Sequence, residues 1–366
     1  MSPITEKTTE ATSESVTERT QPLAPMQRPD APGARGAKGA KGAKAGPVMV
    51  IGHTGLLGQA LMRVAGERGL RTLGISRRTV PGLNLARQAD LAPFLDRLAP
   101  SLVINAAAIT DLASCEADAS AALELHVRLP GLLAEWSRQR GTPWVQVSTD
   151  HYWNDIENTL HAEEAPVSPP NTYARTKHAG EELALRNPNC LVLRTNLVGF
   201  RGRSGAPTFV EWALAALAAG EPFDAYTDVW ASSIEAHQFA HALFDLVKMG
   251  TTGLLNLASR EAVSKADFIA ALAEAAGYDA EHMRRVPRPP RQRPRRANAM
   301  GLEVARAEAL LGRALPGAAA VIEAIVASPA MPKPSVRIDL SRGTDVPLDL
   351  DTPTPMQIGR PDVQLA

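Results

Sequence analysis

The sequence predicts an α/β fold, in which a doubly wound parallel sheet has a smaller C-terminal lobe beside it. Short apolar runs alternate with helical patterns from residue 47 to residue 195, and the first run ends in spaced glycines. Alternation of this kind is typical of right-handed βαβ units, whose parallel strands end at a common edge of one sheet. Ligand binding and chemistry are therefore expected at that edge.

Five apolar runs have the length of buried strands, and helical periodicity fills the segments between them. The expected strands are Val48–Ile51, Thr72–Ile75, Leu102–Ile104, Trp144–Val147 and Leu191–Leu193. The expected helices are Leu56–Arg68, Asp90–Leu98, Glu116–Arg140 and Thr176–Arg186. Because proline cannot donate a backbone hydrogen bond, the third helix is expected to kink or break at Pro130.

The pattern is looser after Leu193, which we interpret as the smaller lobe. Helices are expected near Thr208–Ala219, Ile234–Met249, Lys265–Ala276 and Glu303–Leu311, joined by short apolar stretches such as Gly253–Leu257. Residues 1–46 and 330–366 lack the apolar periodicity of a core and are expected to be disordered tails. The Gly-Ala-Lys/Arg triplets within Gly33–Lys44 fit a solvated linker, with a basic nucleic-acid arm as the weaker alternative.

The composition favours a protein of the cytoplasm. The 366 residues include 39 basic and 39 acidic side chains, so no overall field favours a nucleic-acid or membrane partner. Cys115 and Cys190 are the only cysteines, and their spacing supports neither a disulfide framework nor a metal site. The sequence contains no apolar run of the ~18 residues that a membrane span needs.

The first strand leads into Gly52-x-x-Gly55-x-x-Gly58, a glycine-rich turn that precedes a helix. Gly52 can adopt the turn, Gly55 lets backbone N–H groups approach a pyrophosphate, and Gly58 allows close packing of helix on strand. This pattern predicts dinucleotide binding, with Leu56 and Leu57 among the contacting residues.

The second strand indicates which dinucleotide binds. NAD sites usually have an acidic residue about twenty positions after the glycine turn, whereas arginine suits the 2′-phosphate of NADP. Here Arg77 and Arg78 follow the strand and no acid is present. NADP(H) is therefore preferred, NAD(H) is the alternative, and a merely solvated turn is the rival interpretation.

Three later segments carry a family resemblance. These are SLVINAAA at Ser101–Ala108, PWVQVSTD at Pro143–Asp150 and YARTK at Tyr173–Lys177. With the glycine-rich turn, they make residues 47–329 resemble the extended short-chain dehydrogenase/reductases, and among them the sugar-nucleotide reductases and related binding proteins. The resemblance implies a Rossmann-like dinucleotide-binding domain at 47–195 and a lobe at 196–329 that binds a nucleotide sugar.

Tyr173 and Lys177 are the candidate catalytic pair. Residues four apart share a helix face, so the Lys177 cation is expected to lower the pKa of Tyr173 and make it a proton donor or acceptor near neutral pH. Lys177 can also bind the nicotinamide ribose. The alternative is a tyrosine and a lysine on the surface of an amphipathic helix.

The resemblance also implies roles for the strand ends. Thr149 matches the hydroxyl residue that binds the substrate oxygen, and Ser148 is the adjacent alternative. Further cofactor contacts are expected from Asn105, Ala106 and Ala107, and further substrate contacts from Asn196 and Arg296. No metal site is expected.

Several positions depart from the resembled family. His126 replaces a helical asparagine, Leu197 stands where the rhamnose-forming reductases have tryptophan, and the loop 109–116 and the STDHYWND segment are altered. Seven arginines in Arg284–Arg296 suit either a nucleotide diphosphate or a basic surface loop.

These features favour NADP-dependent reduction of a nucleotide-linked 4-keto sugar by a catalyst built on Tyr173 and Lys177. An epimerase or dehydratase on the same fold is one alternative. A non-catalytic NADP-binding regulatory subunit is the other. A homodimer is an open expectation.

Overall fold

The computed structural model describes residues 46–154, 158–202, 206–290 and 293–332. The two predicted tails lie outside the described residues, apart from Gly46 and residues 330–332. None of the helices in these ranges has the length and apolar character that a membrane span requires.

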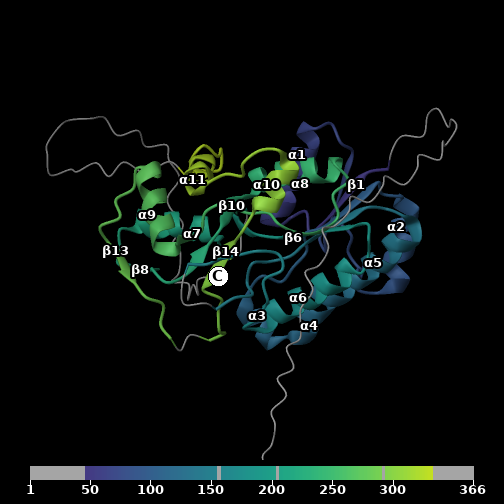
Figure 1. Ribbon diagram of the computed structural model, residues 1–366, viewed down its shortest axis with the longest axis horizontal. Coiled ribbons are helices and arrows are strands. Elements are labelled where there is room, and N and C mark those ends of the chain that lie inside the picture. The colour runs from purple at the N-terminus through teal and green to yellow at the C-terminus, as the bar shows by residue number, and fades with distance from the viewer. Residues whose placement is uncertain (1–45, 155–157, 203–205, 291–292, 333–366) are drawn as a thin grey trace, which may run out of the picture. The chain divides into compact units, whose positions relative to one another are not determined.

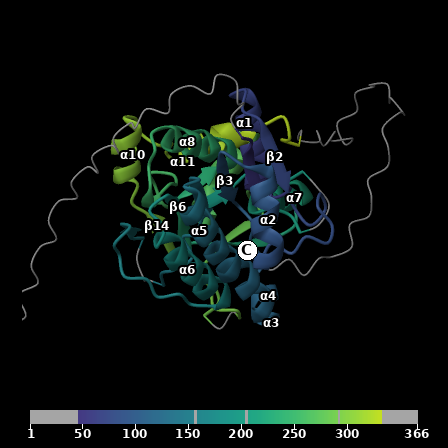
Figure 2. The same ribbon diagram turned by 90° about the vertical axis from the view of Figure 1, so that its right-hand side faces the viewer.

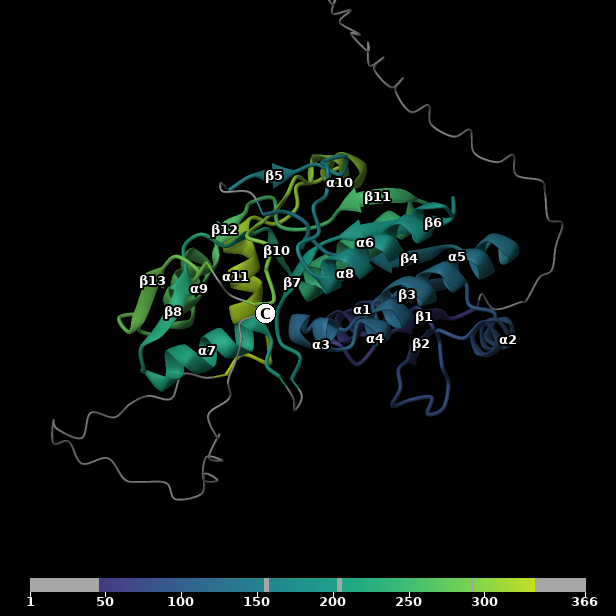
Figure 3. The same ribbon diagram turned by 90° about the horizontal axis from the view of Figure 1, so that it is seen from below.

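Within the described residues, a parallel sheet of six strands has the order β11-β6-β4-β3-β1-β2 (Figure 3). The strands are β1 (Val48–Ile51), β2 (Thr72–Ile75), β3 (Leu102–Asn105), β4 (Trp144–Val147), β6 (Cys190–Arg194) and β11 (Gly253–Asn256). All five expected strands are confirmed. The strand β2 lies on one side of β1 and β3 lies on the other, so the order of the strands changes direction at β1. An open α/β sheet forms its binding crevice at such a point.

Helices cover both faces of this sheet (Figure 2). On β1, Val48 and Val50 pack in the cluster that contains α1 (Leu56–Glu67) and α8 (Ala236–Lys248). Met49 and Ile51 face the opposite cluster, which includes residues of α2 (Gln88–Leu98) and α5 (Leu129–Arg140). Apolar residues at every position of the strand are thus explained by burial on both faces. The predicted doubly wound fold is confirmed.

The long helix expected over residues 116–140 is interrupted. It consists of α3 (Leu112–Ala117), α4 (Ala119–Leu123), a π-helical turn η1 (Glu124–Arg128) and α5. Pro130 lies in the first turn of α5, so the expected interruption falls directly before the proline. Its missing N–H deprives the carbonyl of residue 126 of an α-helical donor, which explains why the irregular turn precedes it.

The sheet takes in chain from both sides of residue 195. The stretch expected as a connector in the smaller lobe forms β11 and pairs with β6, and α8 packs against α1. A separate cluster joins α7 (Phe209–Ala219), α9 (Lys265–Ala276) and α11 (Ala318–Val326). Figure 1 shows α7 and α9 to the left of β6, and α2 and α5 to its right.

The remaining elements are one long helix, one short helix and several short strands. They are α6 (Thr172–Leu185), α10 (Ala305–Leu311), β5 (Leu160–His161), β7 (Asn196–Val198), β8 (Phe223–Tyr226), β9 (Trp230–Ala231), β10 (Ser233–Glu235), β12 (Val263–Ser264), β13 (Met283–Val286) and β14 (Ala299–Leu302). β7 pairs with β10 in parallel, and β8 pairs with β13 in parallel. Because β7 begins two residues after β6 ends, the β7–β10 pair lies at the carboxyl end of β6.

Candidate active site

The glycine-rich turn is tightly packed. Gly52 has φ +85°, and a Cβ there would lie 2.8 Å from the backbone nitrogen of Ala107. A Cβ on Gly58 would lie 2.2 Å from the Gly52 carbonyl oxygen. Gly55 is the N-cap of α1 and has more room, with 3.3 Å to the same oxygen. Side chains would thus block the turn at Gly52 and the approach of α1 at Gly58.

A cavity of about 820 Å³ opens at the carboxyl ends of β1, β2 and β3. Its lining includes Ile51, Gly52, Thr54, Gly55, Ile75, Ser76, Arg77, Arg78, Val80, Gly82, Leu83, Asn84, Leu85, Ala86, Ala106, Ala107, Ala108, Ile109, Ala121, Glu124 and Leu125. Of the expected cofactor contacts, Gly52, Gly55, the two arginines and both alanines line it, whereas Gly58 does not.

Leu56, Leu57 and Asn105 are also expected cofactor contacts, but none of them lines the cavity. Leu57 is buried in the core and Leu56 packs against it, so neither side chain lines the cavity. Asn105 is also buried; its Nδ2 donates to Gln146 Oε1 over 2.8 Å and its Oδ1 accepts from Ala107 N over 3.3 Å. Asn105 therefore fixes the backbone of Ala107, which lines the cavity, without lining the cavity itself.

The exposed side chains of Arg77 and Arg78 stand at the β2 end of the cavity. A turn fixes their backbone, because Ser76 N donates to Thr79 Oγ1 over 2.9 Å and Thr79 N donates to Ser76 O over 3.1 Å. Neither guanidinium forms an ion pair within the described ranges. Both are available to a phosphate.

Tyr173 and Lys177 lie on α6. Asn171 caps this helix by accepting from Ala174 N over 2.8 Å, and Lys177 Nζ donates to the carbonyl oxygen of Val147, at the end of β4, over 2.7 Å. Burial lowers the pKa of Lys177 to about 8. Lys177 is thus held against the strand that precedes Thr149.

The expectation that Lys177 lowers the pKa of Tyr173 is wrong for this structure. Burial raises the pKa of Tyr173 to about 12, and a hydrogen bond with Thr149 only partly offsets that effect. Desolvation of the buried phenol is the largest effect, and Lys177 Nζ lies against the Val147 carbonyl oxygen. The phenol is protonated at neutral pH and can donate a proton.

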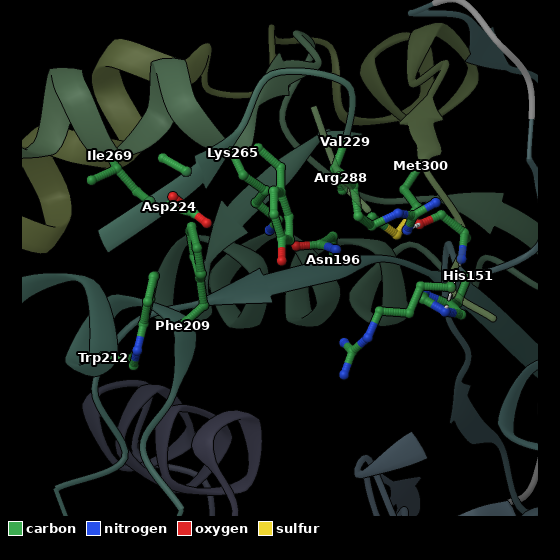
Figure 4. A pocket seen from close by; sticks show the side chains of 14 residues that line it. His151, Asn196, Phe209, Trp212, Asp224, Val229, Lys265, Ile269, Arg288 and Met300 are labelled. Carbon is green, nitrogen blue, oxygen red and sulfur yellow. Dashed lines mark hydrogen bonds between the residues drawn. The ribbon is translucent and has the colours of Figure 1, made fainter. Parts of the chain in front are cut away.

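A second, smaller cavity of about 100 Å³ lies beside the carboxyl end of β4. It is lined by His151, Asn196, Phe209, Trp212, Asp224, Ala225, Tyr226, Val229, Lys265, Ile269, Arg288, Arg296, Ala297 and Met300. Figure 4 shows Trp212 and Ile269 at one end, His151 at the other, and Asn196 and Lys265 between them. Aromatic walls and three cations therefore share one cavity.

Asn196 and Arg296, both expected substrate residues, line this cavity. Asn196 Nδ2 donates to Asp150 Oδ2 over 2.7 Å, which fixes its orientation. Burial and the neighbouring Arg288 lower the pKa of Arg296, whose Nε is buried without a hydrogen-bond partner in the described part of the chain. In the same arginine-rich stretch, Arg284 forms an ion pair with Asp224 at the surface. One part of the stretch therefore lines the cavity and another part is a basic surface segment.

Ser148 lies apart from both cavities. Its hydroxyl donates to Glu181 Oε2 over 2.7 Å, and Glu181 forms a buried ion pair with Arg194 over 2.5 Å. Ser148 therefore belongs to a buried hydrogen-bonded network with Glu181 and Arg194, and it does not face the substrate cavity. Thr149, which accepts from His151 N over 3.3 Å, faces the other way toward Tyr173.

His126 contacts Tyr173, although the sequence indicated only that it replaces an asparagine of the resembled family. Its Nε2 accepts from Ile109 N over 2.9 Å, so Nδ1 carries the proton and donates to Thr176 Oγ1 over 2.9 Å. Its ring meets the edge of Tyr173 at 5.6 Å between centroids. Burial lowers the pKa of His126 to about 3, so it stays neutral. His126 thus connects Ile109, in the wall of the larger cavity, to Thr176 on α6.

A family model described as the RmlD substrate binding domain matches residues 46–327. The chain belongs to this family. It is 32% identical over 242 residues to the probable low-salt glycan biosynthesis reductase Agl14 of Haloferax volcanii. The aligned region covers 63% of this chain and 80% of that protein. It is 30% identical over 243 residues to the dTDP-4-keto-6-deoxy-D-glucose reductase of Streptomyces niveus, covering 65% and 82%.

Solved structures of the RmlD type share the fold. The dTDP-4-dehydrorhamnose reductase of Bacillus anthracis, in complex with NADP, has a TM-score of 0.69 at 17% identity and covers 78% of this chain and 98% of that one. A hypothetical dTDP-4-dehydrorhamnose reductase from Sulfolobus tokodaii has a TM-score of 0.65 at 24% identity, covering 74% and 96%.

The family resemblance predicted from the sequence is therefore confirmed. Family membership, together with relatives that are named reductases, identifies the chain as an NAD(P)-dependent oxidoreductase of the extended short-chain dehydrogenase/reductase type.

Proposed function

We propose that this RmlD-family protein uses NADPH to reduce the 4-keto group of a nucleotide-linked 6-deoxy sugar. The observation that carries the proposal is the position of Tyr173 between the two cavities. Its ring lies 5.6 Å from that of His126, which holds Ile109 at the larger cavity, and 5.9 Å from that of His151, which lines the smaller one. A reductase needs its proton donor at such a junction.

The larger cavity fits NADPH. Its turn has room only for glycine at Gly52 and Gly58, which keeps side chains away from the backbone that would face a pyrophosphate. Arg77 and Arg78 would hold the 2′-phosphate, and no carboxylate follows β2 to compete with it. When bound, NADPH supplies the hydride that reduces the carbonyl carbon.

The protein supplies the proton and the orientation. Tyr173 donates its phenolic proton to the carbonyl oxygen as the C–O bond gains negative charge, which completes the alcohol. Thr149 binds the same oxygen from the end of β4, and its hydrogen bond with Tyr173 keeps the two hydroxyls together. The hydrogen bond with Thr149 favours the phenolate that remains, until solvent reprotonates it.

The smaller cavity supports the choice of a nucleotide sugar. Phe209, Trp212 and Tyr226 offer aromatic faces to a base, and Arg288 and Arg296 suit a diphosphate. Relatives named for dTDP-linked keto sugars make a dTDP-4-keto-6-deoxyhexose the first substrate to assay. We also propose the division at residue 195 as a functional one, with the cofactor contacts before it and, apart from Thr149, His151 and Tyr173, the sugar-nucleotide contacts after it.

The test is NADPH oxidation, followed by absorbance, with a panel of dTDP- and UDP-linked 4-keto sugars. Consumption of NADPH with formation of the 4-hydroxyl sugar supports the proposal. Interconversion of hexoses by tightly held NAD without net NADPH consumption would replace it with an epimerase. Binding of NADPH with no turnover on any substrate would favour a regulatory subunit.

A further inference from the structure

His151 follows Thr149 and Asp150 at the carboxyl end of β4. Its backbone N–H donates to Thr149 Oγ1 over 3.3 Å, and its ring packs edge-on against Tyr173 at 5.9 Å and 76°. The same ring lines the smaller cavity. One short turn therefore carries the imidazole, the Thr149 hydroxyl and the contact to the proton donor.

The hydrogen bonds of His151 fix its tautomer. Ala297 N donates to Nε2 over 3.2 Å, so Nε2 is unprotonated and Nδ1 carries the proton. Within the described residues, Nδ1–H has no acceptor. The ring thus has one anchored nitrogen and one unused donor, and it lines a cavity in which a ligand could supply the acceptor.

The electrostatic surroundings keep His151 neutral. Burial lowers its pKa to about 3, and the nearby cations Arg296, Arg288 and Lys265 act in the same direction. A neutral N–H donor suits an uncharged oxygen such as a sugar hydroxyl, whereas the arginines in the same cavity suit phosphate.

We infer that His151 is a specificity-determining residue that donates a hydrogen bond from Nδ1 to the 3-hydroxyl oxygen of the sugar. The inference rests on the proposed function, because it takes the oxygen bound by Thr149 and Tyr173 to be the 4-keto oxygen. Of the two ring carbons beside that carbonyl, only C3 carries a hydroxyl group, since C5 of a 6-deoxyhexose carries a methyl group and the ring oxygen. A hydrogen-bond donor packed against Tyr173 therefore discriminates sugars by the substituent at C3.

Two variants separate the roles of the two ring nitrogens. His151→Asn places an amide near Nδ1 and leaves Ala297 N without its acceptor. His151→Gln places an amide near Nε2, which preserves the anchor and removes the donor from the cavity. Each variant and the wild type are assayed with dTDP-4-keto-6-deoxyglucose and with its 3-deoxy analogue, and urea unfolding and NADPH affinity serve as controls for folding.

We expect the wild type to prefer the 3-hydroxyl substrate in kcat/KM by about tenfold, which is the effect of one neutral hydrogen bond. His151→Gln should lose this preference by slowing only on the 3-hydroxyl substrate, whereas His151→Asn should retain it. Equal losses on both substrates, or no loss on either, would overturn the inference while leaving the reductase function intact.

A measurement without turnover separates the inference from the proposed function. Calorimetry with dTDP-6-deoxyglucose and its 3-deoxy form should show the same preference in Kd, and the Gln variant should abolish it. If the wild type reduced no sugar but kept this binding preference, the proposed reaction would fail and the His151 contact would stand. If the wild type bound both ligands equally, the contact would be refuted.

Discussion

Replacing Tyr173 by phenylalanine tests the proton donor with the least disturbance to packing. The ring, which makes the edge contacts with His126 at 5.6 Å and with His151 at 5.9 Å, is retained. Only the hydroxyl and its hydrogen bond with Thr149 are removed. Because Lys177 is held by the Val147 carbonyl over 2.7 Å and not by the phenol, its position should not change.

The expected loss is in kcat. Removal of a positioned acid typically costs ~10²–10⁴-fold in rate, or about 3–5 kcal/mol in the activation barrier. The phenol is protonated across the neutral range, since its pKa is raised to about 12. The variant therefore lacks a donor at every working pH, and a change of pH should not restore its rate.

The assay is the rate of NADPH oxidation at saturating dTDP-4-keto-6-deoxyglucose, with NADPH affinity measured separately by fluorescence. Tyr278→Phe is the matched control, because that tyrosine packs against the apolar cluster of α7, α9 and α11. The control should keep the wild-type kcat. A Tyr173→Phe variant that turned over as fast as the wild type would refute the assignment of the proton donor. A parallel loss of NADPH affinity would show that the substitution had disturbed the fold.

Three further predictions concern the cofactor, the lysine and the packing of α6. Replacing both Arg77 and Arg78 by alanine should weaken NADPH binding far more than NADH binding in calorimetry, and equal weakening would remove their phosphate role. Since Lys177 is charged below its pKa of about 8, kcat/KM should fall as the pH rises through that value, and Lys177→Arg should move the fall to higher pH; a profile unchanged by Lys177→Arg would exclude the lysine as its source. A Cβ on Gly180 would lie 1.8 Å from a backbone oxygen of η1, so Gly180→Ala should lower the free energy of unfolding in urea by about 1–3 kcal/mol. Gly66→Ala makes the same change in open space on α1 and should raise it by about 0.5–1 kcal/mol, whereas two equal effects would argue against the steric reason.

The central sheet could be predicted because each of its strands is buried on both faces and therefore appears as a short apolar run. The expected bounds of β1, β2 and β4 match the structure, and those of α9 match because Ser264 caps its start and Gly277 ends it. The place of β11 in the sheet could not be predicted, since an apolar run does not say which strand it pairs with. The π-helical turn before Pro130 has no sequence pattern of its own.

The site was predictable where a motif fixes the local geometry. Gly52 and Gly58 meet the steric demand inferred for them, whereas Ser148 does not line a cavity because adjacent residues at a strand end point in opposite directions. The pKa of Tyr173 could not be inferred from its spacing to Lys177, since the dominant effect is burial by distant parts of the chain.

The substrate cavity draws on chain far from the strand motifs. His151, Asn196 and Lys265 line it together although more than a hundred residues separate the first from the last. No local pattern indicates such a meeting, because it depends on how β7, β10 and α9 pack beside β4.

The most direct test of the proposed reaction is the fate of the cofactor's hydrogen. NADPH deuterated at C4 of the nicotinamide is incubated with the enzyme and dTDP-4-keto-6-deoxyglucose, and the nucleotide sugar is analysed by mass spectrometry and NMR. The account predicts deuterium on sugar carbon C4, with the incorporation rate sharply reduced in Tyr173→Phe. Recovery of unlabelled sugar with NADPH still bound, or of an isomerised sugar without deuterium, would contradict it.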